Sequence, residues 1–232
     1  MMTSATYAQS RANLTQYFDR TAFDAWAKLT SDAPVSRIRA RVRAGRDRMR
    51  DTLLSFLPAD MTGLTLLDAG CGTGALAVEA ARRGAKVTAI DVSAQLINIA
   101  RERAPRDLGH GRIDFQVGDM ASPDLGHFDH VVAMDSLIHY RTNDIAAAVA
   151  SLAQRTGSSI AFTIAPRTPA LNILWAAGKL FPRSDRSPAI IPAGPNALAR
   201  KLAAAMPGWQ AGRSHRVNAS FYTSQALEWR RA

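Results

Sequence analysis

A glycine-rich stretch is the part of this sequence whose residue types are best suited to hold a ligand. Residues 68–74 read Asp-Ala-Gly-Cys-Gly-Thr-Gly, with an apolar run, 64–67, before them and a helical pattern that begins near Ala75. Glycines at alternate positions remove the Cβ atoms that would hold a ligand away from the backbone, and they allow the positive φ angles of a tight turn. The pattern therefore predicts a strand, a ligand-binding loop and a helix, in that order.

Three aspartates accompany the loop, and each lies at the carboxyl end of a predicted strand. Such ends meet at one edge of a parallel sheet, so we expect Asp68, Asp91 and Asp119 to face one crevice. A carboxylate at Asp68, two residues before the first glycine, suits the ammonium group of an amino acid. Asp91 can hold the hydroxyl groups of a ribose, and Asp119 can accept a hydrogen bond from an adenine amino group with Met120 packed on the ring. The simpler alternative is that Asp91 and Asp119 only cap helices.

A nicotinamide-binding loop is the first competing interpretation. That class uses G-x-G-x-x-G after its first strand and an acidic residue about twenty positions later. Here Gly70, Gly72 and Gly74 are spaced one residue short, while Asp91 can serve a ribose in either fold. Because Asp68 would lie poorly against a pyrophosphate, this carboxylate and the glycine spacing both disfavour an NAD-dependent oxidoreductase.

The composition excludes several classes of protein. The chain has 232 residues, a net charge of +10, 29 basic residues that are mostly arginine, and one cysteine, Cys71. One cysteine rules out an internal disulfide and a cysteine-based zinc site, and the scattered histidines predict no protein-bound metal. No apolar run approaches the ~18–20 residues of a membrane-spanning helix. The first six residues lack a secretory pattern, so we expect a cytoplasmic protein.

The positive charge predicts an anionic partner, which could be a nucleic acid, a membrane surface or an acidic metabolite. Arginine suits bidentate contacts with carboxylate and phosphate groups. A nucleic-acid-binding module is disfavoured, because the sequence lacks the aromatic pattern of such modules. The predicted fourth strand also runs into Asp135 and Ser136, and not into the Asn-Pro-Pro-Tyr type sequence of amino-methylating nucleic-acid enzymes.

The order of the predicted elements indicates an α/β fold. The first sixty residues read as helices, and from residue 64 short apolar runs alternate with helical segments. Five buried strands are predicted over 64–67, 86–90, 113–117, 131–134 and 159–164. The helices between them are predicted over 75–83, 94–103 and 144–154. Uniformly apolar strands joined by right-handed crossovers give a doubly wound sheet with helices on both faces.

An insertion interrupts this alternation after the fifth strand. Residues 165–207 hold proline-rich segments and two helical stretches, and we interpret them as a lid at the edge where such sheets bind ligands. Two further strands, 209–213 and 217–223, are predicted to close the chain as an antiparallel edge hairpin. The sequence thus divides into an N-terminal helical cap (1–60), a cofactor-binding core (61–164), the lid insertion (165–207) and C-terminal strands (208–232).

The glycine motif resembles that of the class I S-adenosylmethionine-dependent methyltransferases. The motif becomes specific when it is joined to Ile90-Asp91-Val92-Ser93 and Gly118-Asp119-Met120. The resemblance implies a Rossmann-like sheet of seven strands, the last antiparallel, with S-adenosylmethionine as the methyl donor. It also implies the cofactor-binding residues, which are Asp68, Ala69, Gly70, Gly72, Asp91, Val92, Gly118, Asp119, Met120 and Asp135.

Beyond the fold, residues from about 17 to 222 are similar to the magnesium-protoporphyrin IX O-methyltransferase family. The matches are Tyr17-Phe18 with Phe23 and Trp26, Arg43-x-Gly45, Cys71, Leu137-Ile138-His139-Tyr140, Ala165-Pro166-Arg167-Thr168, Leu180-Phe181-Pro182, and Gly208-Trp209 before Phe221-Tyr222. Two positions depart from the family: its basic run after the tryptophan is reduced to Ala27-Lys28, and Arg46 aligns with a family histidine.

The resemblance implies transfer of a methyl group to one propionate carboxylate of magnesium-protoporphyrin IX, in chlorophyll or bacteriochlorophyll synthesis. His139 and Tyr17 are then expected to be the catalytic residues, which position the reacting groups. The implied substrate-binding residues are Arg43, Arg167, Arg183 and Trp175. The magnesium belongs to the substrate, so none is expected to be bound by protein ligands. A related methyltransferase that acts on a quinone precursor or another small acid is the alternative within this class.

Two kinds of partner follow from the same resemblance. The porphyrin-carrying subunit of magnesium chelatase is the expected source of a poorly soluble substrate. The basic, partly apolar N-terminal region could also touch anionic lipid, which would place the protein at the periphery of a photosynthetic membrane. No nucleic-acid partner is expected.

Overall fold

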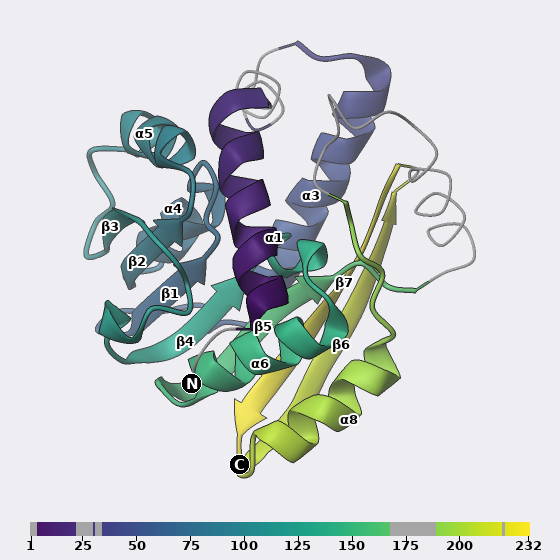
Figure 1. Ribbon diagram of the computed structural model, residues 1–232. Helices are drawn as coiled ribbons and strands as arrows, with labels where there is room; N and C mark the ends of the chain where they lie inside the picture. Colours follow the sequence, from purple (N-terminus) through teal and green to yellow (C-terminus); the bar gives the residue numbers. More distant parts are fainter. Residues whose placement is uncertain (1–3, 22–29, 31–33, 168–188, 220) are drawn as a thin grey trace.

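The computed structural model describes residues 4–21, 30, 34–167, 189–219 and 221–232, and its centre is a seven-stranded sheet (Figure 1). The strands are β1 Thr65–Ala69, β2 Lys86–Asp91, β3 Arg112–Val117, β4 Phe128–Ala133, β5 Thr156–Ile164, β6 Trp209–Ala219 and β7 Tyr222–Arg231. Their order across the sheet is β3-β2-β1-β4-β5-β7-β6. Pairing is parallel from β3 to β5, and β7 pairs antiparallel with both β5 and β6. The predicted class I methyltransferase sheet is confirmed.

The order of the strands reverses between β1 and β4, which pair directly. The chain runs from β1 outward to β2 and β3, returns to β4, and then continues to the other side with β5. Loops that leave two neighbouring strands in opposite directions open a crevice at the carboxyl ends of those strands. The topology therefore places a ligand crevice beside Ala69 and Ala133, the last residues of β1 and β4.

Helices cover both faces of the sheet (Figure 1). The helices are α3 Arg37–Ser55, α4 Ala75–Arg82 and α5 Ala94–Arg103 on one face, and α1 Ala5–Gln16, α6 Thr142–Ala153 and α8 Pro195–Ala205 on the other. Three short helical turns join them: η1 Tyr17–Thr21, η2 Pro123–Leu125 and η3 Leu137–His139. Each face has its own apolar core, in which Leu53 of α3 and Ile145 of α6 are fully buried. Burial of one such side chain stabilises the fold by roughly 1.5–3 kcal/mol.

Helix α3 carries most of the arginines of the N-terminal region and packs against β6, β7 and α4. It begins after Ser36, whose side chain accepts a hydrogen bond from the N–H of Arg39. Gly45, Met49 and Leu53 follow one another at intervals of four and form its buried stripe. Because that spacing keeps side chains on one face of a helix, the arginines between them lie on the other sides.

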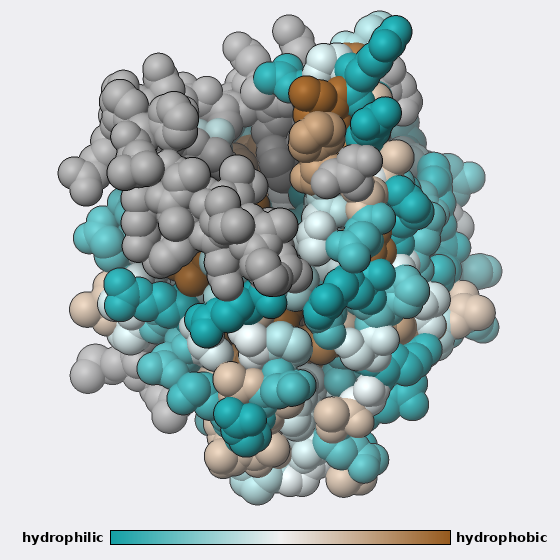
Figure 2. Space-filling view, turned by 90° about the vertical axis from the view of Figure 1, so that its right-hand side faces the viewer, coloured by the Kyte–Doolittle hydropathy of each residue, from teal (hydrophilic) through white to brown (hydrophobic). Residues whose placement is uncertain are grey.

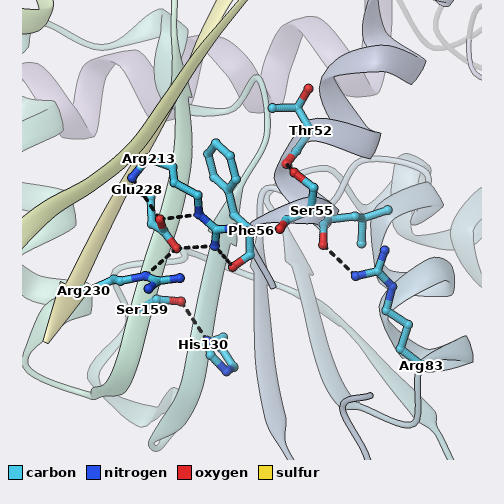
Figure 3. A network of polar contacts seen from close by, with 10 residues as sticks. Thr52, Ser55, Phe56, Arg83, His130, Ser159, Arg213, Glu228 and Arg230 are labelled. Carbon is cyan, nitrogen blue, oxygen red and sulfur yellow. Dashed lines mark hydrogen bonds and ion pairs between the residues drawn. The ribbon is translucent and has the colours of Figure 1, made fainter. Parts of the chain in front are cut away.

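Arginines from outside α3 hold its carboxyl end in place (Figure 3). Arg213 of β6 donates to the carbonyl oxygens of Ser55 and Phe56, and Arg83 donates to that of Leu54 at 2.6 Å. The last four carbonyl groups of a helix have no partner within it, so these donors satisfy acceptors that would otherwise be left to water. The end of α3 is thereby tied to the sheet edge and to the turn after α4.

Glu228 of β7 orients Arg213 and is itself almost fully buried (Figure 3). Its carboxylate lies 2.7 Å from Nη2 of Arg213 and 2.9 Å from Nε of Arg230. Burial alone would raise the pKa of Glu228, but the hydrogen bonds from Arg213 and Arg230 outweigh it and lower the pKa to about 2. The carboxylate is therefore a charged, structural part of the sheet edge.

The C-terminal hairpin differs from the prediction. The predicted antiparallel edge hairpin is present, but β6 continues to Ala219 and β7 begins only at Tyr222, so the bounds predicted for its two strands, 209–213 and 217–223, are wrong. Residues 209–219 form one long edge strand, β6, whose central positions are polar and exposed and therefore read as a turn. The coloured part of this side of the molecule is mainly hydrophilic, with apolar residues scattered among the polar ones (Figure 2). Its partner β7 buries the alternate residues Ser224, Ala226 and Glu228. Two of these are polar or charged, so the sequence does not show the apolar alternation that is typical of a strand.

Candidate active site

A cavity of about 310 Å³ lies at the carboxyl ends of β1, β2 and β4. Its wall combines the glycine loop, those strand ends, α3 and part of the N-terminal helices. The described residues that line it are Leu14, Phe18, Thr30, Arg43, Arg46, Asp47, Arg50, Asp68, Gly70, Cys71, Gly72, Thr73, Ala75, Leu76, Ile90, Asp91, Val92, Leu96, Gly118, Met120, Met134, Asp135, Ser136, His139 and Tyr140. The wall includes every residue predicted to bind the cofactor except Ala69 and Asp119.

The glycine loop turns sharply between β1 and α4. Gly70, Gly72 and Gly74 adopt positive φ angles of 84°, 56° and 80°. A Cβ atom at position 70 would lie 2.3 Å from Cβ of Ser136, so a larger residue would push away the segment that follows β4. The predicted strand, loop and helix are present, and the loop presents its backbone to the cavity.

Asp91 ties the glycine loop to the end of β2. Its carboxylate accepts hydrogen bonds from the N–H groups of Gly72 and Ser93, each at 2.9 Å. Burial raises the pKa of Asp91, and the two N–H groups only partly oppose that shift. The N-terminal cap of α5 is Ser93, whose hydroxyl accepts from the N–H of Leu96, so Asp91 is not the cap of that helix. Its carboxylate lines the cavity and retains acceptor capacity for a ligand hydroxyl.

Asp68 is buried at the end of β1, with 1% of its surface exposed. Its Oδ2 atom has no hydrogen-bond partner in the described part of the chain. Burial, followed by the charge of Asp91, raises the pKa of Asp68 to about 7. An unpartnered buried carboxylate is costly unless a ligand supplies a donor. The site is therefore suited to a cationic group, and an ammonium is the simplest.

Asp119 faces the N-terminal helix and not the cavity. Its Oδ1 accepts from the hydroxyl of Tyr7 at 2.6 Å and from the N–H of Ala121 at 2.9 Å. Its Oδ2 pairs with Arg11 at 2.6 Å. Burial raises the pKa of Tyr7, which is stacked on Tyr140 with ring centroids 4.8 Å apart. Asp119 thus holds α1 against the cavity wall, a contact that sequence reasoning did not predict.

Asp135 lies two residues beyond β4 in a left-handed backbone conformation, with φ of 53°. Its Oδ2 is 2.6 Å from Nη1 of Arg46, and both oxygens accept from the hydroxyl of Tyr222 at 3.0 and 3.1 Å. Its own N–H donates to Oγ1 of Thr163 at 2.7 Å. Burial raises the pKa of Tyr222. This carboxylate is satisfied by the protein, unlike that of Asp68.

Of the two predicted catalytic residues, His139 lines the cavity and Tyr17 does not. His139 ends η3, and its Nδ1 is 3.4 Å from the carbonyl oxygen of Ala189. Tyr17 begins η1, and its ring packs edge-on against Phe18 with 5.2 Å between the centroids. Phe18 is in the cavity wall, so Tyr17 is one ring removed from the cavity.

Comparison with known proteins identifies the family. The family described as magnesium-protoporphyrin IX methyltransferase C-terminus matches residues 133–231, and a general methyltransferase domain matches residues 66–157. The magnesium-protoporphyrin O-methyltransferase of Rhodobacter capsulatus is 52% identical over 225 residues, which cover 97% of this chain and 98% of that one. This chain belongs to the magnesium-protoporphyrin O-methyltransferase family.

A solved structure of the family has the same fold. The crystal structure of magnesium protoporphyrin IX methyltransferase from Synechocystis PCC 6803 with bound SAH superposes with a TM-score of 0.83, at 29% identity over 95% of this chain and 99% of that one. A ubiquinone biosynthesis O-methyltransferase of Xanthomonas oryzae is 34% identical, but over only 53% of this chain and 54% of that one. Similarity to the magnesium-protoporphyrin family therefore extends well beyond the part shared with quinone enzymes.

Of the four substrate-binding residues that the family resemblance implies, the structure describes two. Arg43 is in the cavity wall. Arg167 is exposed outside it, and its N–H donates to the carbonyl oxygen of Ala193 at 3.0 Å. Arg183 and Trp175 lie outside the described residues.

Sequence reasoning missed Arg46, Phe18 and Tyr222 as parts of the site. Arg46 is one of many arginines in α3, and only its register against Asp135 sets it apart. Tyr222 follows the hairpin turn that was predicted at the wrong place. The sequence Tyr17-Phe18 indicated that aromatic rings lie near the site, but it did not indicate which of the two lines the cavity.

The sequence also led to expectations about metal binding and membrane-spanning helices. Among the described residues, no three His, Cys, Asp or Glu side chains are grouped so that they could hold a metal ion. No helix in the described ranges has the length and apolar character needed to cross a bilayer.

Proposed function

We propose that this protein transfers a methyl group from S-adenosylmethionine to one propionate carboxylate of magnesium-protoporphyrin IX, giving the monomethyl ester and S-adenosylhomocysteine. The observation that carries the proposal is the 52% identity to the Rhodobacter capsulatus enzyme over 97% of the chain. That similarity includes the C-terminal half, where the family-specific match covers residues 133–231. It therefore supports the acceptor as well as the donor.

The cavity has the groups that S-adenosylmethionine requires. The unpartnered Oδ2 of Asp68 would accept a hydrogen bond from the ammonium group, close to the backbone of Gly70. Asp91 would hold the ribose hydroxyls, and Val92 with Met120 would border the adenine. When bound, S-adenosylmethionine supplies an electrophilic methyl group on a sulfonium.

The remaining cofactor-binding predictions have more indirect roles in this proposal. Gly72 and Gly118 keep the cavity free of side chains next to the ribose and adenine. Ala69 offers its carbonyl oxygen to Oγ of Ser136 at 2.8 Å, which joins the two strand ends beneath the ligand. Asp119 fixes α1 over the adenine end through Tyr7 and Arg11.

The acceptor needs little chemical activation. A carboxylic acid with a pKa of roughly 4–5 is already ionised at neutral pH, so no strong general base is required. The protein's contribution is then to align the carboxylate with the methyl group and to exclude water. His139 in the cavity wall would hold the carboxylate in line. Tyr17 would act through Phe18, by fixing the ring that closes the wall.

The flat, apolar macrocycle would lie beside the N-terminal cap and the insertion. Arg43 in the cavity wall, with Arg167, Arg183 and Trp175 from the insertion, are the proposed contacts for the second propionate and the ring. In this proposal each of the four parts of the chain has its own role. Residues 61–164 would bind the donor, and 208–232 complete the sheet. Residues 1–60 and 165–207 would enclose the acceptor, apart from α8, which packs against α6 on one face of the sheet.

Delivery of a poorly soluble porphyrin favours a partner. We propose the porphyrin-carrying subunit of magnesium chelatase as that partner, and peripheral contact with a photosynthetic membrane by an otherwise cytoplasmic protein. The support on the surface is the amino-terminal half of α3, where Arg37, Arg39 and Arg41 are exposed beside Ile38, which is 55% exposed. Basic and apolar groups on one helix suit an anionic lipid surface.

The function is tested by incubation with methyl-labelled S-adenosylmethionine and one of three acceptors: magnesium-protoporphyrin IX, its dimethyl ester, or a catechol precursor of a quinone. We expect label only on the first, as a monomethyl ester separated by chromatography. Label on the catechol but not on the porphyrin would contradict the proposal and favour the quinone alternative. Tight NADH binding without S-adenosylhomocysteine binding in calorimetry would exclude a methyltransferase altogether.

A further inference from the structure

The acceptor in the proposed reaction is an anion, yet the cavity wall is rich in carboxylates. The described acidic and basic side chains of the wall, His139 apart, are Asp47, Asp68, Asp91, Asp135, Arg43, Arg46 and Arg50. A carboxylate entering a water-poor cavity is repelled by like charges and needs a cation close by. The site therefore requires an arginine whose position is fixed at the acceptor end.

The arginines of the wall differ in their partners. Arg50 forms an ion pair within its own helix, with Nη1 3.0 Å from Oδ1 of Asp47. Arg46 reaches across to the end of β4, with Nη1 2.6 Å from Oδ2 of Asp135. The side chains of Arg46 and Asp135 are only 20% and 5% exposed, so this pair is largely removed from solvent.

The anchor of Arg46 is itself immobilised. Asp135 is held by its N–H bond to Thr163 and by the hydroxyl of Tyr222. Tyr222 reaches it because position 45 lacks a side chain: a Cβ on Gly45 would lie 2.7 Å from Cδ1 of Tyr222. Two neighbouring residues of α3 therefore support the same aspartate: Gly45 leaves room for the Tyr222 ring, and Arg46 pairs with Asp135.

In the proposed complex the pair of Arg46 and Asp135 would also lie beside the donor. Asp135 precedes Ser136, whose Oγ donates to the carbonyl oxygen of Ala69 and whose Cβ lies against Gly70. Asp68 and Gly70 form the part of the wall suited to the amino-acid end of the donor. Arg46 would thus be anchored near the methyl group of a donor bound in this way.

We propose that Arg46 binds the carboxylate of the methyl acceptor, and that Asp135 and Tyr222 are positioning residues that hold its guanidinium; this rests on the proposed function. A guanidinium has five N–H donors in a planar fork, so an anchor on one nitrogen is compatible with a second carboxylate on another edge. Holding that fork in place before binding reduces the entropy that the acceptor must overcome.

One consequence separates this role from a purely structural one. Methyl transfer turns the charged carboxylate into a neutral ester, which cannot form a charge-assisted bond with Arg46. Wild-type protein should therefore bind the acid more tightly than the ester, by about tenfold or more. Loss of Arg46 should remove that preference, whereas a loosened fold would weaken both forms alike.

The test measures binding of magnesium-protoporphyrin IX and of its monomethyl ester, the proposed product, to the complex of the full chain with S-adenosylhomocysteine, by quenching of tryptophan fluorescence. The variants are Arg46→Met, Arg46→Lys and the double variant Arg46→Met with Asp135→Asn, which leaves no unpaired charge. Arg48→Met is the matched control, because Arg48 is exposed on the same helix and donates to the carbonyl oxygen of Ala44. Affinity for S-adenosylhomocysteine and the melting temperature are measured for each.

We expect Arg46→Met and the double variant to lose about tenfold or more in affinity for the acid but not for the ester. Arg46→Lys should keep part of the preference, and Arg48→Met all of it. If the double variant binds the acid as wild type does, Arg46 only neutralises Asp135 and the inference is wrong. It is also wrong if Arg46→Met keeps the full preference. Wild type that binds neither porphyrin would overturn the proposed function and this inference together, whereas the other two failures leave the function standing.

Discussion

Asp68 and Asp135 are both buried carboxylates in the wall of one cavity, but their surroundings are opposite. Asp68 is the next-to-last residue of β1, its Oδ2 has no partner among the described residues, and its pKa is raised to about 7. Asp135 follows β4 and is paired with Arg46 and bonded to Tyr222. A buried carboxylate that the protein satisfies stabilises its surroundings, whereas an unsatisfied one costs stability until a ligand supplies the missing donor.

With the roles proposed for Asp68 and Arg46, this difference would let one cavity hold a cationic donor and an anionic acceptor side by side. At the donor end the protein provides the negative charge and leaves it open. At the proposed acceptor end Arg46 pairs with Asp135, so an anion would meet a neutralised carboxylate. Variants at each end can show whether donor binding and acceptor binding change independently of one another.

Glu228 extends the comparison to a third buried carboxylate, which resembles Asp135 in being paired with arginines. Its pKa is lowered from 4.5 to about 2, so it contributes stability above pH 4.5 that is lost as the pH falls toward 2. The shift corresponds to at most about 3 kcal/mol, and solvent screens part of it because Arg213 and Arg230 are about half exposed. Glu228→Gln should therefore lower the unfolding free energy at pH 7 by about 1–3 kcal/mol, measured by urea denaturation. The difference from wild type should vanish near pH 2; a constant difference at every pH would contradict the assignment.

Asp68→Asn tests the unsatisfied carboxylate. We expect affinity for S-adenosylhomocysteine to fall about 30- to 100-fold, because a charge-assisted bond to the ammonium is replaced by a neutral one. Stability should change in the opposite direction. The raised pKa means that the folded state holds its proton more tightly than the unfolded state, so wild type loses stability as the pH rises from about 4 to 7. The variant should therefore melt at a higher temperature than wild type at pH 8. Unchanged affinity in calorimetry would sink the role assigned to Asp68.

Gly45→Ala tests the support of the satisfied carboxylate. The added methyl group would lie 2.7 Å from Tyr222, so helix and ring must separate. Overpacking of this kind costs about 1–3 kcal/mol, and we expect a loss of stability near the middle of that range. Affinity for S-adenosylhomocysteine should stay within about threefold of wild type, since the donor end is untouched. Gly157→Ala is a matched control for stability alone, because the nearest atom to its added methyl group, at 3.7 Å, is in ordinary contact.

The pH dependence of donor binding gives the smallest effect. With a pKa of about 7, half of the Asp68 carboxyl groups are protonated at neutral pH in the ligand-free protein. A protonated carboxyl group cannot pair with an ammonium, so affinity for S-adenosylhomocysteine should fall about tenfold between pH 8 and pH 6. Calorimetry at the two pH values would show it, together with uptake of the released proton by the buffer. Asp68→Asn should be flat over this range; an equal slope in the variant would assign the titration to another group.

The geometry of the proposed donor half of this site could be predicted from the sequence, because its parts are local. Gly70 and Gly72 have positive φ angles that few other residues adopt, and Asp68 and Asp91 lie at the carboxyl ends of strands whose apolar pattern is plain. Each feature depends on residues within a short stretch of chain. Only their convergence in one cavity needed the doubly wound topology, which the alternation of strands and helices indicates.

The geometry of the proposed acceptor half could not be predicted in the same way, because its contacts join distant segments. Arg46 and Asp135 are 89 residues apart, and Tyr222 is a further 87 residues along the chain. Nothing local distinguishes Arg46 from the other arginines of α3, and the positive φ of Asp135 has no sequence signal. The role of Tyr222 was not predicted, because the exposed polar residues in the middle of β6 were interpreted as the hairpin turn.

The most direct test of the comparison is an initial-rate grid over S-adenosylmethionine and magnesium-protoporphyrin IX for wild type, Asp68→Asn and Asp135→Asn. We predict that Asp68→Asn raises the KM for the donor about 30-fold or more and leaves the KM for the porphyrin within about threefold. Asp135→Asn should do the reverse, with a porphyrin KM raised about tenfold and a donor KM nearly unchanged. Two variants that raise the same KM, or both constants equally, would contradict the claim that one carboxylate serves the donor and the other the acceptor.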